Sequence, residues 1–214
     1  MKQILVYSDS VGWGMVPGTR ERFPFDQRWP GVLENALDGL GAGVRVIENS
    51  LAGRKTVWDD PWRPGRNGAV GLAEVIEINS PLALVVIQLG TNDFQAPHDI
   101  PAWASAAGVG RLVDIIRQAP IEPGMPRPGI LVLVPPDIVE PKGANVLKFQ
   151  GAPARSKGFG DALKAMAEQK QVGLFDLNRV TAASTLDGIH LDRDQHAAIG
   201  QALAPVVARM LAAA

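Results

Sequence analysis

The 214-residue sequence contains no cysteine. This absence excludes a disulfide framework, a cysteine nucleophile and metal sites built from thiolates. The chain also lacks an excess of charge of either sign: its formal net charge is -1, which favours neither nucleic acid nor an anionic membrane surface as a partner. No apolar run reaches the length of a membrane-spanning helix, and the run after Met1 is too short for a signal peptide. We therefore expect a cytoplasmic protein with no membrane attachment.

What the sequence does contain is typical of an α/β protein. Hydrophobic residues make up 46% of the chain, and its length fits one domain, residues 1–214, with a sizeable core. Five short and nearly continuous apolar runs are typical of buried parallel strands: 3–7, 44–48, 82–89, 129–134 and 172–177. Between them lie segments with helical periodicity: 29–37, 69–78, 102–118, 158–170 and 196–213. The alternation predicts a three-layer α/β/α fold with a doubly wound, flavodoxin-like sheet of five parallel strands.

Three connections are longer than simple turns require: 15–28, 54–67 and 135–157. The first two are rich in proline, glycine, arginine and aromatic residues, and each follows the carboxyl end of a predicted strand. Ligands of open α/β sheets bind beyond these strand ends, and long loops there are commonly functional. We therefore predict the functional site at this edge of the sheet.

Two serines flank Asp9 where the first predicted strand ends. Ser10 stands just past the strand on a glycine-containing turn, which is the position of the nucleophile in α/β hydrolases. It does not match the G-x-S-x-G motif, because no glycine stands two residues before it. Hydroxyl groups that cap backbone amides would also explain both serines.

A serine nucleophile needs a base, and the chain has 3 histidines. His190 lies in the segment TLDGIHLD, in a polar turn before the last predicted helix. Asp187, three residues earlier, could orient the imidazole and stabilise the imidazolium. An aspartate at a helix N-cap next to a histidine without function would give the same spacing.

Two further groups follow the second and third strands. Gly53 in NSLAGRKT offers an unobstructed backbone N–H, and Asn92 in QLGTNDF offers a side-chain amide. Each segment alone indicates only a turn. Together they place hydrogen-bond donors suited to an oxyanion hole at the edge where Ser10 and His190 are expected.

The order of these motifs resembles the SGNH (GDSL-like) hydrolase family over essentially the whole chain. The matching segments are SDSV, NSLAGRKT, LGTND and DGIHLD. The resemblance implies a catalytic triad of Ser10, Asp187 and His190, and an oxyanion hole formed by Ser10, Gly53 and Asn92. Two residues depart from the pattern: Ser8 replaces the usual glycine and Val11 the usual leucine. We interpret Ser8 as structural and Asp9 as a carboxylate that organises the turn.

Further segments resemble the arylesterase/acyltransferase branch of that family, among them SVGWGMVPG, RFPFDQRWPGVL and DDPWRPGRNGA. This resemblance implies a serine esterase that hydrolyses short-chain aryl or alkyl esters, with acyl transfer to alcohols as a second activity. It also implies a homo-oligomer, a small-molecule ester as substrate, and no metal or organic cofactor. Trp13, Met15 and Trp58 are predicted to contact the substrate, and a tryptophan-lined channel would favour compact acyl esters.

The same motifs also serve carbohydrate O-acetyl esterases, thioesterases and lysophospholipases, so these substrates stay open alternatives. An aspartate-based phosphatase using Asp9 would need a second carboxylate two residues on, where Val11 stands. A non-catalytic scaffold with this fold would usually have lost one of the reactive residues, and here all are present.

Overall fold

The computed structural model describes residues 1–213. Its centre is one parallel sheet with the strand order β2-β1-β3-β4-β5. The strands are β1 (Lys2–Ser8), β2 (Val44–Ser50), β3 (Leu84–Gln88), β4 (Gly129–Val134) and β5 (Gly173–Asp176). This is the flavodoxin-like order, in which the direction of winding reverses between β1 and β3.

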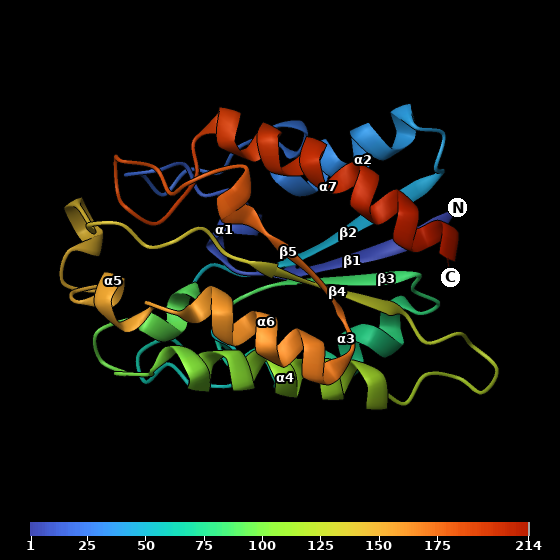
Figure 1. Ribbon diagram of the computed structural model, residues 1–214, viewed down its shortest axis with the longest axis horizontal. Helices are drawn as coiled ribbons and strands as arrows, with labels where there is room; N and C mark the ends of the chain where they lie inside the picture. Colours follow the sequence, from blue (N-terminus) through green and yellow to red (C-terminus); the bar gives the residue numbers. More distant parts are fainter. Residues whose placement is uncertain (214) are drawn as a thin grey trace.

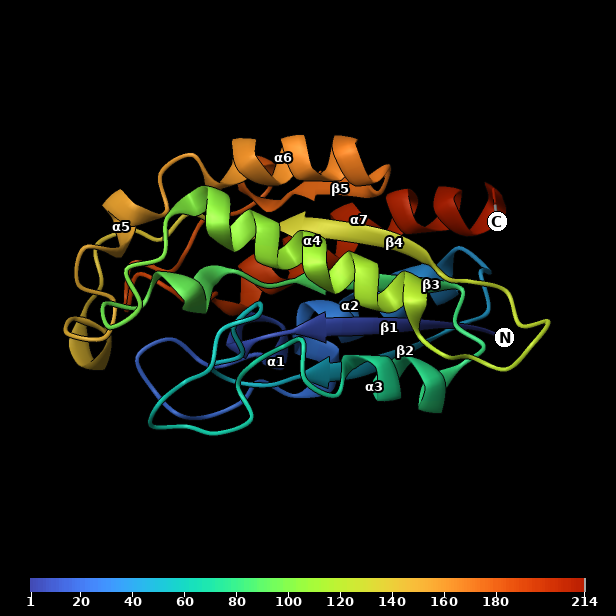
Figure 2. The ribbon, with the colours of Figure 1, turned by 90° about the horizontal axis from the view of Figure 1, so that it is seen from below.

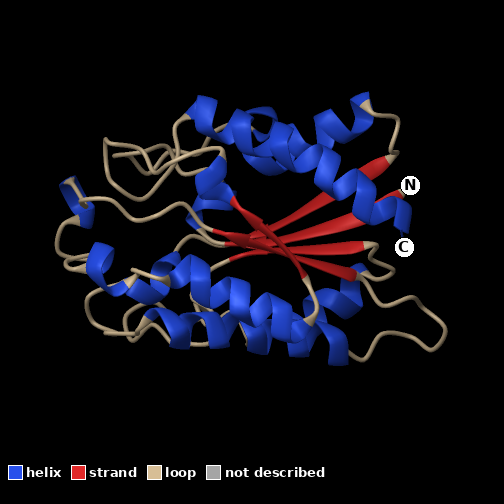
Figure 3. Cartoon of the chain, viewed as in Figure 1, coloured by secondary structure: helices blue, strands red, loops and turns tan. Residues whose placement is uncertain are grey.

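Helices cover both faces of the sheet (Figure 1, Figure 3). One face carries α2 (Trp29–Gly39) and α7 (Arg193–Ala213), and the other carries α3 (Leu72–Asn79), α4 (Ala102–Gln118) and α6 (Phe159–Lys170). Two single-turn helices, α1 (Ser10–Trp13) and α5 (Ala152–Arg155), and the 3-10 turns η1 (Phe25–Gln27), η2 (Thr91–Phe94), η3 (Gly143–Asn145) and η4 (Leu177–Arg179) lie in the connections. The predicted three-layer fold is confirmed.

The sheet separates two hydrophobic cores. Along β1, Ile4 and Val6 pack toward α2 and α7, whereas Leu5 and Tyr7 pack toward α3, α4 and α6. Successive side chains of a strand point to opposite faces, so a strand buried on both sides needs apolar residues at every position. This explains why the strands read as continuous apolar runs instead of alternating ones.

The predicted element boundaries differ from the structure by a few residues. The helix expected from residue 69 begins at Leu72, because Gly71 is its N-cap and Val70 before it is 70% exposed. The last helix begins at Arg193, three residues earlier than predicted. The sequence pattern did not predict α1 and α5, because a helix of four residues is too short to show a period of 3.6.

The carboxyl ends of all five strands point to one edge of the sheet, where the long connections gather on the left of Figure 2. Ser10 follows β1 there, Gly53 follows β2 and Asn92 follows β3. No helix within residues 1–213 combines the length and the hydrophobicity that crossing a membrane requires.

Candidate active site

Ser10, His190 and Asp187 meet at this edge. Ser10 is the first residue of α1, and its Oγ lies 3.1 Å from His190 Nε2. On the other side of the imidazole, His190 Nδ1 lies 2.6 Å from Asp187 Oδ2. All three residues are buried. This is the serine–histidine–carboxylate geometry in which a histidine can take a proton from the hydroxyl while the carboxylate holds its ring.

The Asp187 carboxylate is held by a tight turn. Its Oδ1 accepts the backbone N–H groups of Ile189 at 3.0 Å and His190 at 2.9 Å, and its Oδ2 accepts the N–H of Gly18 at 3.1 Å. Burial acts to raise the pKa of Asp187, but the hydrogen bond and charge of His190, with the backbone N–H groups, outweigh burial and lower the pKa. Asp187 is therefore ionised and can stabilise an imidazolium at His190.

Two hydrogen-bond donors face the same cavity as Ser10. Gly53 lines the cavity with a φ of +85°, a left-handed conformation that favours glycine. A Cβ at this position would lie 2.9 Å from Arg63 Nη1, so glycine also leaves room for that guanidinium. Asn92, in η2, lines the cavity opposite and contributes its side-chain amide.

The Asn92 amide is fixed at both ends. Its Nδ2 donates to Asp9 Oδ2 at 3.1 Å, and its Oδ1 accepts from Gln95 Nε2 at 2.7 Å. Because an amide nitrogen has two N–H groups, one remains for a bound oxyanion. The neighbouring Lys55 is fully buried, and its Nζ donates to Gln95 Oε1 at 3.3 Å and to Asp60 Oδ2 at 2.8 Å. No pattern in the sequence indicates this supporting chain of polar residues.

Asp9 connects the serine to the amide. Its Oδ1 accepts the Val11 N–H at 2.9 Å, which caps α1, and its Oδ2 accepts from Asn92. Burial raises the pKa of Asp9 to about 6, although the Val11 N–H, the charges of His190 and Arg54, and Asn92 oppose that rise. The turn-organising role expected for Asp9 agrees with its Val11 contact. Its contact with Asn92 joins two strand ends that no sequence pattern relates.

Ser8 lies below the site, and its hydroxyl does not face the cavity. Its Oγ donates to Gln88 Oε1 at 2.8 Å and accepts the Gly12 N–H at 3.2 Å. The hydroxyl therefore satisfies a second N–H group at the start of α1. A Cβ at position 12 would lie 2.2 Å from Ser8 Oγ, so Ser8 depends on a glycine there.

Ser10 and its partners line a cavity of about 480 Å³. Of the three residues predicted to contact the substrate, Met15 is among the residues that line the cavity, whereas Trp13 and Trp58 are not. The ring of Trp13 instead lies 4.8 Å from the guanidinium carbon of Arg22, and Trp58 is half-buried in the 54–67 connection. Within the part of the chain that the structure describes, no group of three acidic or histidine side chains could hold a metal ion.

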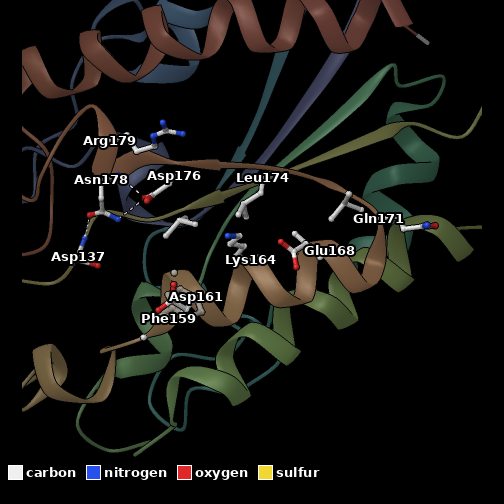
Figure 4. Close-up of a pocket in the computed structure, with 15 residues that line it drawn as sticks. Asp137, Phe159, Asp161, Lys164, Glu168, Gln171, Leu174, Asp176, Asn178 and Arg179 are labelled. Carbon is white, nitrogen blue, oxygen red and sulfur yellow. Dashed lines mark hydrogen bonds between the residues drawn. The ribbon is translucent and has the colours of Figure 1, made fainter.

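A second and larger hollow, of about 830 Å³, lies between α6 and the edge strand β5; we call it the α6 groove (Figure 4). Its charged lining residues are Asp137, Asp161, Lys164, Glu168, Asp176 and Arg179. Figure 4 shows Asn178 reaching between Asp176 and Asp137 at the end of β5.

Comparisons with known proteins agree with this geometry. Residues 9–198 match the GDSL-like lipase/acylhydrolase family. An arylesterase from Vibrio mimicus is 26% identical over 118 residues, which are 55% of this chain and 50% of that protein, so the match spans about half the length of that relative. The inhibitor-bound aryl esterase of M. smegmatis superposes with a TM-score of 0.93 at 34% identity, covering 98% of this chain and 100% of that one. A carbohydrate acetylesterase from Sinorhizobium meliloti superposes with a TM-score of 0.91 at 31% identity, covering 98% and 100%.

Proposed function

The chain belongs to the GDSL-like lipase/acylhydrolase family, and from this premise we propose that it is a serine esterase of short-chain acyl esters. The observation that carries the proposal is that His190 contacts both Ser10 Oγ and Asp187, and that all three residues line one cavity. The names of the similar proteins, an arylesterase and a carbohydrate acetylesterase, support carboxylic esters as the substrate class.

In the first step, Ser10 Oγ attacks the ester carbonyl carbon while His190 Nε2 takes the hydroxyl proton. The 3.1 Å separation of these two atoms is within reach for this transfer. Asp187 holds the ring at Nδ1 and stabilises the positive charge that forms on it. The carbonyl π electrons move to oxygen and give a tetrahedral oxyanion.

The oxyanion is bound by the N–H groups of Ser10 and Gly53 and by the free N–H of Asn92. Asp9 and Gln95 hold the Asn92 amide before the substrate arrives, so little reorganisation is needed as the charge develops. A preorganised donor of this kind stabilises the transition state by about 3–4 kcal/mol.

The second half returns the enzyme to its starting state. His190 gives the proton to the leaving alkoxide, and the carbonyl re-forms as an acyl ester on Ser10 Oγ. A water molecule then attacks the acyl carbon while His190 takes a proton from that water. The bond from the acyl carbon to Ser10 Oγ breaks, His190 returns the proton to Ser10 Oγ, and the carboxylic acid departs. An alcohol in place of that water would give acyl transfer, the second activity that we propose.

Carbohydrate O-acetyl esters are the second candidate substrate class. The polar lining of the cavity favours them: Thr19, Arg63, Asn145 and Lys148 all present hydrogen-bonding groups there. Binding roles for Met15, Trp13 and Trp58 stay predictions, of which the position of Met15 supports the first.

We also propose a homo-oligomer whose contacts surround the cavity mouth. Three large apolar side chains near it are strongly exposed: Trp62 by 70%, Leu147 by 80% and Leu186 by 64%. Leu186 lines the cavity, and Trp62 and Leu147 directly precede the lining residues Arg63 and Lys148; exposed apolar side chains at a site commonly mark a protein contact surface. Analytical ultracentrifugation of the purified protein would measure the stoichiometry, and a monomer at micromolar concentration would contradict this proposal.

The test of the esterase is the Ser10→Ala variant assayed with 4-nitrophenyl acetate. We expect kcat to fall by about 10⁶-fold, as for other serine nucleophiles, and labelling by a fluorophosphonate probe to disappear. Ser156→Ala, which changes a half-buried serine at the C-terminal end of α5, serves as the matched control and should keep full activity and labelling. Activity that survives Ser10→Ala, or wild-type protein that the probe does not label, would overturn the proposal.

A further inference from the structure

The residues that line the cavity at Ser10 carry more positive charge than the chain as a whole. Four of its lining residues are cationic: Arg20, Arg63, Lys142 and Lys148. The one lining carboxylate is Asp187, which is occupied by His190. The whole chain, in contrast, has a formal net charge of -1. The positive charge at the cavity is therefore local.

These four cations lack acidic partners. Among the residues that the structure describes, none of them forms an ion pair with a carboxylate, although five ion pairs of lysine or arginine occur elsewhere in the chain. Lys142 Nζ donates to a neutral acceptor, the carbonyl oxygen of Thr185, at 2.8 Å. Their charge is therefore available to a bound molecule.

Arg63 is held close to the reacting groups. Its Nη1 lies 2.9 Å from the position that a Cβ on Gly53 would occupy, which puts the guanidinium beside the proposed oxyanion hole. Its backbone N–H donates to Asp60 Oδ1 at 3.0 Å, and the other oxygen of Asp60 accepts from the buried Lys55 at 2.8 Å. The base of the side chain is thus anchored before any ligand binds.

Lys148 approaches the same space from the 135–157 connection. Its carbonyl oxygen accepts the Ala96 N–H at 2.8 Å, which ties this segment to the end of η2. Burial lowers the pKa of Lys148, and the charges of Arg63 and Lys55 lower it further, while the charges of Asp60 and Asp9 oppose this only in part. Like charges crowded in this way repel one another, and a bound anion relieves the repulsion.

The geometry indicates which part of a substrate meets these cations. The reacting carbonyl must lie at Ser10, His190 and Asn92, and a short acyl group fills little of the 480 Å³. The alcohol part of the ester then occupies the remaining space, which Arg63 and Lys148 line.

We propose that this cavity selects short-chain esters whose alcohol part carries an oxyanion, a carboxylate or a phosphate. The inference rests on the proposed esterase function and names its substrate class. Electrostatic complementarity of this kind raises the association rate and the affinity for the anionic substrate, and added salt screens both.

Three acetate esters that differ in one group test the proposal: 4-acetoxybenzoate, 4-acetoxyphenyl phosphate and the neutral 4-acetoxybenzamide. The amide withdraws electrons more strongly than the carboxylate and makes the better leaving group, so chemical reactivity alone favours the neutral ester. At low ionic strength we expect kcat/KM to be about 10-fold higher for the anionic esters, and the anionic-to-neutral ratio to fall to one or below in 0.5 M NaCl. The better of the two anionic esters identifies the preferred group.

Two variants assign the effect to residues. Arg63→Gln and Lys148→Met should each lower the anionic-to-neutral ratio by about threefold, and the double variant should bring it to one or below. Arg179→Gln removes an exposed cation from the α6 groove and is the matched control; its ratio should equal that of the wild type. A wild-type ratio near or below one, or a ratio unchanged in the double variant, would overturn the inference.

Binding to the Ser10→Ala variant separates this inference from the proposed function. Isothermal titration should show tighter binding of 4-acetoxybenzoate than of 4-acetoxybenzamide. If the variant discriminates in this way while the wild type hydrolyses neither ester, the anion site stands and the esterase proposal fails. If the wild type hydrolyses both esters equally and the variant binds both equally, the esterase stands and the anion site fails.

Discussion

The two hollows of this protein differ in a way that their sizes do not indicate. The α6 groove, at about 830 Å³, is larger than the cavity at Ser10, at about 480 Å³. The groove is lined by the chain from β4 to η4 alone. The cavity draws its residues from the segments after β1, β2, β3 and β4 and from the turn before α7. Convergence of complementary groups from distant segments, and not volume, distinguishes the reactive site.

The strand order explains the difference. Winding of the sheet reverses between β1 and β3, so the connections after these two strands leave toward opposite faces and open a crevice. Ser10 and Asn92 stand at the two sides of that crevice. The α6 groove lies at β5, the last strand of the sheet, where no such reversal occurs.

Substituting one aspartate in each hollow should give the largest difference in activity between the two hollows. Both Asp187 and Asp176 accept backbone N–H groups of their own turns. We expect Asp187→Asn to lower kcat by about 10⁴-fold, because an amide does not stabilise the imidazolium and favours the wrong tautomer. Asp176→Asn should change kcat less than about twofold, since it touches no reacting atom. Steady-state kinetics with 4-nitrophenyl acetate measure kcat of both variants. Equal losses of kcat would contradict the assignment of the reaction to the cavity at Ser10.

Asparagines in the two hollows should differ by a smaller factor. Asn92→Ala removes one donor to the oxyanion, and we expect a 10²- to 10³-fold loss in kcat with little change in KM. Asn178→Ala removes a side chain that bridges Asp137 and Asp176 in the groove, and should lower stability by about 1 kcal/mol without changing kcat. A loss confined to KM in Asn92→Ala would argue against the oxyanion role.

One source of acid sensitivity lies outside both hollows, at His196 in α7. This buried histidine accepts the Trp29 N–H at its Nδ1, and burial, with the charges of Arg28 and His190, lowers its pKa to about 3. The unfolded chain binds the proton near pH 6.5, so the stability contribution is present above that pH and is lost as the pH falls toward 3. We expect the His196 contribution to fall by about 3 kcal/mol between pH 7.5 and pH 4, whereas Asp9, whose pKa is raised to about 6, binds its proton more tightly in the folded state and opposes part of that loss.

Urea unfolding of the His196→Asn variant at several pH values checks this prediction. Asparagine can still accept the Trp29 N–H but takes up no proton, so the variant should lose about 3 kcal/mol less than the wild type between pH 7.5 and pH 4. His98→Asn, which alters a half-buried histidine in a loop, is the matched control and should change the profile less. An unaltered profile in His196→Asn would place the acid sensitivity elsewhere.

The smallest effect is expected for Ser8→Gly, directly beneath the cavity. The variant loses the hydrogen bonds to Gln88 and to the Gly12 N–H, which should lower the free energy of unfolding by about 1–2 kcal/mol. Because Asp9 still caps α1, kcat should stay within about threefold of the wild type. Thermal unfolding and kinetics measure the two quantities, and a 100-fold loss of kcat would assign Ser8 to the reaction.

Much of the fold could be predicted from the sequence, because strands buried on both faces must be apolar throughout. The boundaries were less accurate, since α3 begins at a glycine cap and α1 has a single turn. A single domain over residues 1–214 and a cytoplasmic location stay predictions.

The reactive residues could be found from motif order, but their support could not. The contact between Asp9 and Asn92 joins residues 83 positions apart, and the buried Lys55 reaches Gln95 across 40 positions. No periodic pattern in the sequence reveals either contact. Tertiary structure also decides that Met15 lines the cavity while Trp13 lies beside Arg22.

The close approach of the Ser8 side chain to Gly12 has a consequence for how the sequence of this turn can change in evolution. A Cβ at position 12 would lie 2.2 Å from Ser8 Oγ and 3.1 Å from Ser50 Oγ, so a side chain at position 12 first requires glycine at position 8 and a small shift of Ser50. The reverse order passes through an intermediate that cannot pack the first turn after β1. The two positions are therefore epistatic, and the order in which they mutate is constrained although neither takes part in the reaction.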